Sequence, residues 1–151
     1  MYFPDLSPYS YSLPEPLPGV LTVGWLSAPN PFATGVIEPA HLDTLKYLAV
    51  SQAPHQMRGY SHCELCGRAQ PELEYDGRRR TLGSAEVWVP HATRDGVIFA
   101  APNLVVHYTE AHAYLPPREF LEALAAVDRA SWNAEEACEH VIEEAWPMGE
   151  R

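Results

Sequence analysis

The fold of this chain depends on the stretch Cys63-Glu64-Leu65-Cys66-Gly67 and, with 40 residues between Cys66 and His107, on His107-Tyr108-Thr109-Glu110-Ala111-His112. Two cysteines separated by two residues on a tight turn can hold one metal ion with both thiolates, and two histidines on a following helix can complete a tetrahedron. Thiolate and imidazole ligands suit zinc, whereas calcium and magnesium prefer oxygen. We therefore predict a Zn²⁺ site made by Cys63, Cys66, His107 and His112.

The spacing of the two histidines places a condition on this site. Residues five apart on an ideal helix point about 140° away from each other. His107 and His112 can therefore meet at one ion only if the helix loosens near its C-terminal end, and Pro116 indicates that the helix ends there. His62, next to Cys63, is the alternative ligand if His112 does not reach the ion.

The segment between the two motifs is much longer than in a zinc finger that reads DNA, although the order of the ligands resembles one. Residues 67–81 are polar and charged, and we interpret them as a loop that carries the arginines 78–80 in solvent. Residues 82–89 and 96–101 are rich in β-branched and aromatic side chains and flank a turn before Gly96, which predicts a β-hairpin. Cysteine turn, hairpin and helix would then bring the distant ligands together.

The N-terminal part of the chain combines an extended arm with one strand and one helix. Residues 1–19 contain five prolines and four aromatic side chains, so we expect an extended arm packed across the domain. Residues 20–26 have the composition of a strand. Pro39 then starts a helix of about a dozen residues, whose leucines recur at helical spacing until Pro54 closes the segment.

Two helices are predicted after the histidine motif. Pro116 and Pro117 start a helix over residues 117–130 with an apolar stripe that includes Phe120 and Leu124. A last helix runs from about Ser131, a suitable N-cap, to Trp146, within an acidic C-terminal segment that spans residues 131–151. The fold class is therefore α+β: a zinc knuckle, hairpin and helix within one small domain, residues 1–151.

Composition supports one ordinary domain that folds in a reducing compartment. The chain has 151 residues, 46% of them hydrophobic, and its 15 prolines limit the amount of regular structure. No apolar run approaches the about 20 residues of a membrane span, and no signal peptide is recognisable, so we expect a cytoplasmic protein. The third cysteine, Cys138, is expected to be a buried side chain of the last helix.

The negative charge is concentrated at the C-terminal end. The formal net charge is -10, and residues 110–151 carry ten acidic side chains against three basic ones. Such a field repels the phosphate backbone of nucleic acids and attracts cationic surfaces. The charge therefore favours a basic protein as partner. The alternative is that the acidic side chains only keep the protein soluble.

Several phrases of the chain resemble an uncharacterised bacterial domain family. They are MYFPDLSP (1–8), TVGWL (22–26), MRGYSHCELCG (57–67), LGSAEVWV (82–89) and AAPNLVVHYTEAHAYLPPREF (100–120). The resemblance covers the chain up to about residue 125 and leaves out the tail from about Asp128. It implies a bacterial, metal-binding domain and names no substrate.

The first functional hypothesis is a non-enzymatic binding protein. An acidic domain stabilised by zinc would suit an immunity or antitoxin role, in which it blocks a cationic toxin such as a nuclease by charge complementarity. The candidate surface consists of the acidic side chains of the last helix, Glu135, Glu136, Glu139, Glu143 and Glu144.

Two alternatives remain open at the level of sequence. In a zinc hydrolase, water would replace one of the four ligands, and Glu110 or Glu86 would act as general base; the chain lacks the His-x-Glu and Pro-Cys-x-x-Cys pattern of zinc deaminases, which disfavours this alternative. In a nucleic-acid finger, a group of arginines would face the phosphates: Arg58, Arg68, Arg78, Arg79, Arg80 and Arg94. Six acidic side chains in residues 58–109 offset them, and the residues before His107 are apolar.

Overall fold

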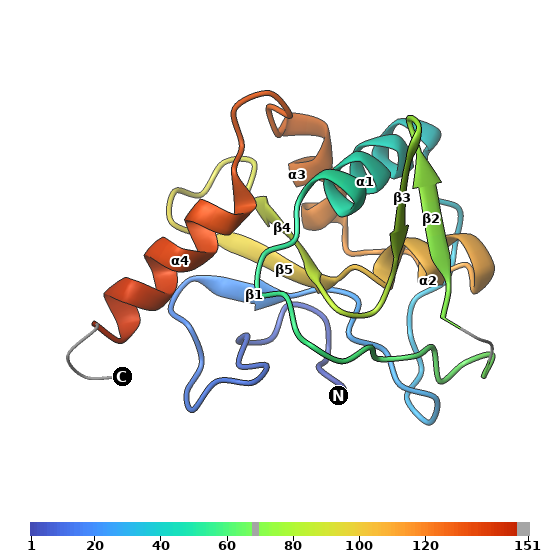
Figure 1. Cartoon of the computed structure of the whole chain (residues 1–151), viewed down its shortest axis with the longest axis horizontal. Coiled ribbons are helices and arrows are strands. Elements are labelled where there is room, and N and C mark those ends of the chain that lie inside the picture. The colour runs from blue at the N-terminus through green and yellow to red at the C-terminus, as the bar shows by residue number, and fades with distance from the viewer. Residues whose placement is uncertain (68–69, 148–151) are drawn as a thin grey trace.

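A computed structural model describes residues 1–67 and 70–147 of the chain (Figure 1). The domain is of the α+β class, as predicted. Its elements in chain order are β1 (Val20–Thr22), α1 (Pro39–Ser51), β2 (Glu72–Tyr75), β3 (Arg78–Thr81), β4 (Glu86–Pro90), β5 (Ile98–Pro102), α2 (Val105–Ala111), α3 (Arg118–Ala126) and α4 (Ala134–Ala145). None of the helices in the described part of the chain has both the length and the apolar character needed to cross a membrane.

A three-stranded sheet with the strand order β1-β5-β4 forms the centre of the fold. The predicted hairpin is confirmed: β4 pairs antiparallel with β5, with Trp88 opposite Ala100. Strand β1 pairs parallel with β5, so the sheet is mixed. The strand predicted over residues 20–26 is shorter than expected, because only Val20–Thr22 pair in this ladder.

The sheet separates two apolar clusters. Successive side chains of a strand point to opposite faces, so Val87 and Val89 lie on one face of β4 and Glu86 and Trp88 on the other. Helices α1, α2 and α3 cover the first face, and the N-terminal arm and α4 cover the second (Figure 1). The two faces are both buried, which explains the nearly continuous apolar sequence of β4.

The N-terminal arm, residues 1–19, is attached to β1 by backbone hydrogen bonds. The amides of Leu6 and Tyr9 donate to the carbonyls of Thr22 and Val20, and the amide of Thr22 donates back to Ser7. The side chain of Tyr9 is fully buried among the second apolar cluster. The arm therefore contributes to the core and is not a loose tail.

Residues 67–81 contain a second hairpin where the sequence analysis predicted a loop. Strands β2 and β3 pair antiparallel around Asp76 and Gly77, so the prediction of a loop was wrong. Arg78 and Arg79 are exposed to solvent as predicted, and Arg80 is half-buried. Asp76 has φ 49° and Gly77 φ 75°, the pair of positive values that a two-residue type I′ turn requires. Asp-Gly between two short strands is a recognised hairpin signal, and the polar composition of the strands obscured it.

The two C-terminal helices begin later than predicted. Helix α3 starts at Arg118 with Pro117 as its N-cap and ends at Ala126, four residues before the predicted end at residue 130, and α4 starts at Ala134. The N-cap of α4 is Asn133, whose side chain accepts a hydrogen bond from the amide of Glu136, and not Ser131. Helix α4 ends at Ala145, and residues 148–151 of the predicted acidic segment lie outside the described residues.

Candidate metal centre

The cysteine turn forms one side of the candidate centre. The backbone amides of Leu65 and Cys66 donate hydrogen bonds to the Cys63 thiol, and the amide of Gly67 donates to the carbonyl of Cys63 over 3.2 Å. Gly67 has φ 59°, the left-handed conformation that glycine adopts without steric cost. Amides directed at sulfur stabilise a thiolate and orient it for an ion.

Helix α2 forms the other side. It follows directly on β5, and its buried side chains Val105, Val106 and Tyr108 fix it on the sheet. His107 lies within the helix, whereas His112 is its C-cap with φ -124° and ψ 10°. The chain thus leaves helical geometry at His112, which is the loosening that the five-residue spacing requires.

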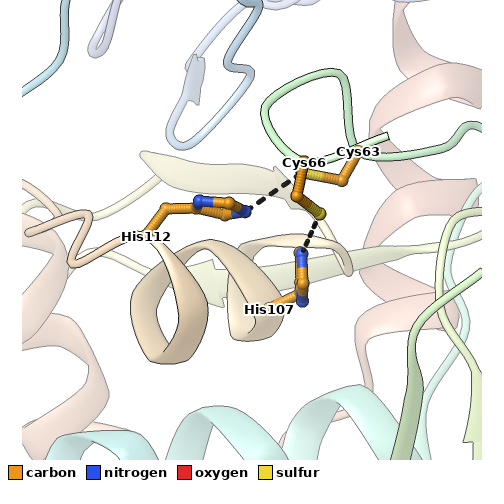
Figure 2. Close-up of side chains that lie close together, drawn as sticks. All are labelled: Cys63, Cys66, His107 and His112. Atoms are coloured by element: carbon orange, nitrogen blue, oxygen red, sulfur yellow. Dashed lines mark hydrogen bonds between the residues drawn. The ribbon is translucent and has the colours of Figure 1, made fainter. Parts of the chain in front are cut away.

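The four predicted ligands lie together (Figure 2). Cys63 Sγ lies 3.4 Å from His112 Nε2, and Cys66 Sγ lies 3.5 Å from His107 Nε2. The four candidate ligand atoms are all within 4.8 Å of one another, so the cluster can hold a metal ion. The two imidazole rings are nearly perpendicular, at 80°, and their centroids are 5.1 Å apart.

Burial affects the protonation of the centre. In the metal-free chain, burial raises the pKa of the Cys63 thiol, and the neighbouring Cys66 adds to this effect. Burial also raises the pKa of Tyr108, with a further contribution from the charges of Cys63 and Glu64. A cation between the sulfur atoms would favour the thiolates, so metal binding must release protons from the centre.

The other side chains considered from sequence lie elsewhere. His62 is exposed and does not belong to the four-residue cluster. Glu110 forms an ion pair of 2.9 Å with Lys46, which ties α2 to α1. Cys138 is 4% exposed on the inner side of α4, and burial, followed by the charge of Glu86, raises its pKa to about 12.

The sequence analysis missed a second polar cluster, which is centred on Glu86. This carboxylate is 2% exposed, and Tyr9, His55 and Trp88 surround it. The signal was present in the sequence: a glutamate at the first position of the apolar strand EVWVP shares the face of Trp88 and must be buried with it. The partners Tyr9 and His55 are 77 and 31 positions away along the chain, so no local pattern connects them.

A family model described as a domain of unknown function (DUF7919) matches residues 1–125. The chain belongs to this family. The match includes the four residues of the metal centre and ends within α3, so α4 lies outside it. No curated protein and no solved structure matches the chain.

Proposed function

We propose that the centre binds a structural zinc ion. A tetrahedral zinc with Zn–S bonds of about 2.3 Å and Zn–N bonds of about 2.0–2.1 Å has sulfur-to-nitrogen edges of about 3.5 Å. The two measured sulfur-to-nitrogen distances, 3.4 and 3.5 Å, agree with this edge. Two thiolates and two imidazoles are the donor set of structural zinc sites.

Four protein ligands disfavour the hydrolase alternative. A catalytic zinc needs a coordination position for water, and here the complete set of four donors converges on one point. The two glutamates considered as general bases have other contacts, Glu110 with Lys46 and Glu86 with Tyr9 and Trp88. We therefore propose that the zinc ion stabilises the fold and that the protein acts through a surface outside the metal centre.

The function that we propose is the binding of a basic protein in the bacterial cytoplasm through helix α4. All five glutamates of α4 are exposed, and the helix contains no lysine or arginine. Glu136, Glu139 and Glu143 line a shallow groove together with His140. Like charges four residues apart on a helix destabilise it by about 0.2–0.5 kcal/mol, and a cationic partner would relieve such repulsion on α4.

An inhibitor of a cationic toxin, such as a nuclease, is the biological role that fits this surface best. Complementary charge accelerates association and selects partners, which is what an immunity or antitoxin protein requires. The arginines offer less support for nucleic acid. Arg79 pairs with Glu72 and Glu74, and Arg80 donates to the carbonyl of Gln52, while Arg68 lies outside the described residues.

Capture of binding proteins from a bacterial lysate tests the surface. The α4 variant changes Glu136, Glu139 and Glu143 to Gln, and a control variant with the same net charge changes the exposed Glu15, Glu38 and Glu119 to Gln. We expect the wild type and the control to retain a basic protein at low salt and to release it at high salt, and the α4 variant to fail to retain it. Equal retention by the two variants, or the absence of any retained basic protein, would contradict the proposal.

A further inference from the structure

A pocket of about 200 Å³ is lined by Glu86 and by residues of both apolar clusters, among them Trp25 of the second cluster and Leu104 and Tyr108 of the first. It is bounded by the arm at Tyr11, by the segment around His55, and by residues 83–86 before and within β4. Pockets for drug-sized ligands measure about 300–1,000 Å³, so this one suits a ligand of about ten non-hydrogen atoms. Neither the zinc centre nor the acidic surface of α4 accounts for it.

The carboxylate of Glu86 is buried at this pocket and is fully engaged by the protein. The Tyr9 hydroxyl lies 2.7 Å from both carboxylate oxygens, and Trp88 Nε1 donates to Oε1 over 2.8 Å. Nδ1 of His55 lies 3.2 Å from Oε2. Tyr9 and Trp88 donate hydrogen bonds to the carboxylate, and His55 lies within ion-pair distance of it, so little capacity is left for a ligand on the carboxylate itself. We therefore expect Glu86 to act on a ligand through His55.

The arrangement of donors fixes the tautomer of His55. Burial, and then the charge of Glu86, hold the pKa of Tyr9 far above its usual range, so the hydroxyl stays protonated. It donates its hydrogen bond to Glu86. Nδ1 of His55 faces both the Tyr9 oxygen and Glu86, and it must therefore carry a hydrogen. In the neutral imidazole, Nε2 is then the acceptor that remains for a ligand.

The backbone conformation of His55 is also unusual. His55 has φ 53°, a left-handed conformation that costs a non-glycine residue free energy and is concentrated at functional sites. The amide of His55 donates to the Cys138 thiol, which ties this segment to α4. His55 lines the pocket, so its imidazole can present an acceptor to a ligand there.

The remaining walls of the pocket favour a cationic ligand. Aromatic rings of Tyr11, Trp25 and Tyr108 line the pocket, and the rings of Tyr11 and Trp25 lie 4.8 Å apart. The exposed Glu64 adds a second carboxylate, and the lining residues in the described part of the chain include no lysine or arginine side chain; their groups that can carry positive charge are the N-terminus of Met1 and the imidazoles of His55 and His62. Aromatic faces and carboxylates attract organic cations, and planar ones stack on the rings.

We propose that this pocket binds a small planar organic cation of the amidine or guanidine class, which donates an N–H to His55 Nε2 and stacks against Tyr11 and Trp25. Glu86 is a positioning residue that holds the His55 ring through Nδ1. The cation is either a free small molecule or the arginine side chain of a peptide, because both present the same planar group.

Isosteric probes test the charge preference of the pocket. Benzamidine, benzamide and benzoate have nearly the same shape and differ in charge, and a blocked Gly-Arg-Gly tripeptide presents the arginine source. Each probe is titrated into the zinc-loaded protein and followed by NMR. Benzamidine should bind at least about tenfold more tightly than benzamide, because its hydrogen bonds are charge-assisted. Benzoate should bind more weakly than benzamide. Tighter binding of the tripeptide would identify a peptide partner, and tighter binding of benzamidine a free ligand. Undetectable binding of both cations, or equal affinity for benzoate, would overturn the proposal.

Variants locate the site. Asparagine tolerates the left-handed conformation, so His55→Asn removes the imidazole with little backbone cost and should weaken benzamidine binding about tenfold. His91→Asn, between β4 and β5 and outside both the pocket and the α4 groove, should not change it. Tyr11→Leu should weaken binding about threefold and Tyr11→Phe should leave it unchanged, which provides a test outside the buried network. Glu86→Gln should change the ¹⁵N shifts of the His55 ring as well as the affinity, a response that loss of packing alone would not give. Unchanged affinity in His55→Asn would refute the assignment of the acceptor.

Discussion

Cys63 Sγ and His112 Nε2 lie 3.4 Å apart although 49 positions of the chain separate them. This contact joins the turn after α1 to the end of α2, and the four strands β2 to β5 lie between these two points in sequence. An ion at this point would close a loop that contains most of the centre of the chain. The free energy of metal binding therefore becomes part of the free energy of folding.

Loss of one thiolate should unfold the protein. Structural zinc sites contribute about 10–16 kcal/mol of apparent binding free energy, which equals or exceeds the about 5–15 kcal/mol stability of a typical domain. We expect Cys63→Ser to contain no zinc by elemental analysis and to show no cooperative melting transition. A variant with an unchanged melting temperature would show that the ion is dispensable.

The two histidine candidates can be separated in the same way. His112 belongs to the cluster and His62 does not, so His112→Asn should lower zinc affinity by at least about tenfold and lower the melting temperature. His62→Asn, the matched control next to Cys63, should keep one zinc ion per chain. The opposite result would make His62 the fourth ligand.

Acid should release the ion. Burial raises the pKa of the Cys63 thiol in the metal-free chain, so protons compete with the metal for this sulfur, and the competition strengthens as the pH falls. We expect zinc transfer to a chromogenic chelator to be slow and incomplete at pH 7.5 and complete near pH 5. Retention of zinc that does not depend on pH between these values would exclude a site with thiolate ligands.

The sequence predicted that these two cysteines and two histidines form one cluster, because the patterns that indicate it are local. A Cys-x-x-Cys turn and a helix that must loosen at His112 are statements about a few neighbouring residues, and φ and ψ of His112 confirm the second one. The predicted β-hairpin also depended on adjacent residues, and β4 and β5 confirm it.

The sequence did not predict the Glu86 cluster, because its members are joined only by the fold. Tyr9 reaches Glu86 since the arm pairs with β1, and His55 reaches it since the segment after α1 crosses the same face of the sheet. The hairpin of β2 and β3 was missed for a different reason. Its strands are polar and mostly exposed, so they lack the apolar alternation by which strands are recognised.

Alkaline pH should destabilise the protein through Cys138. The folded thiol keeps its proton up to a pKa of about 12, whereas the unfolded thiol loses it near the ordinary value of 9.0. The folded state therefore binds more protons between these values, and stability falls as the pH rises, by about 1.4 kcal/mol at pH 10. Chemical denaturation at pH 8 and pH 10 should show that Cys138→Ala loses less stability than the wild type by this amount. Equal losses in the two proteins would assign the alkaline effect to the buried tyrosines.

A methyl group at Gly83 should disturb both the pocket and the metal centre. Gly83 has φ 119°, and a Cβ atom there would lie 2.2 Å from the carbonyl oxygen of Ser61, a backbone atom that cannot move aside without displacing the cysteine turn two residues later. The amide of Ser61 donates to the carbonyl of Gly83 over 2.8 Å, so the two segments are already in close contact. We expect Gly83→Ala to cost about 3 kcal/mol of stability and to lower zinc affinity as well.

Gly59→Ala is the matched control for this substitution. A Cβ at Gly59 would meet nothing within 4 Å, so its effect on stability should stay within about 0.5 kcal/mol and zinc affinity should not change. Denaturation and zinc titration of both variants distinguish local strain from displacement of the turn. If Gly83→Ala lost stability but kept full zinc affinity, the strain would be absorbed on the β4 side, and the contact between Gly83 and Ser61 would not position the cysteine ligands.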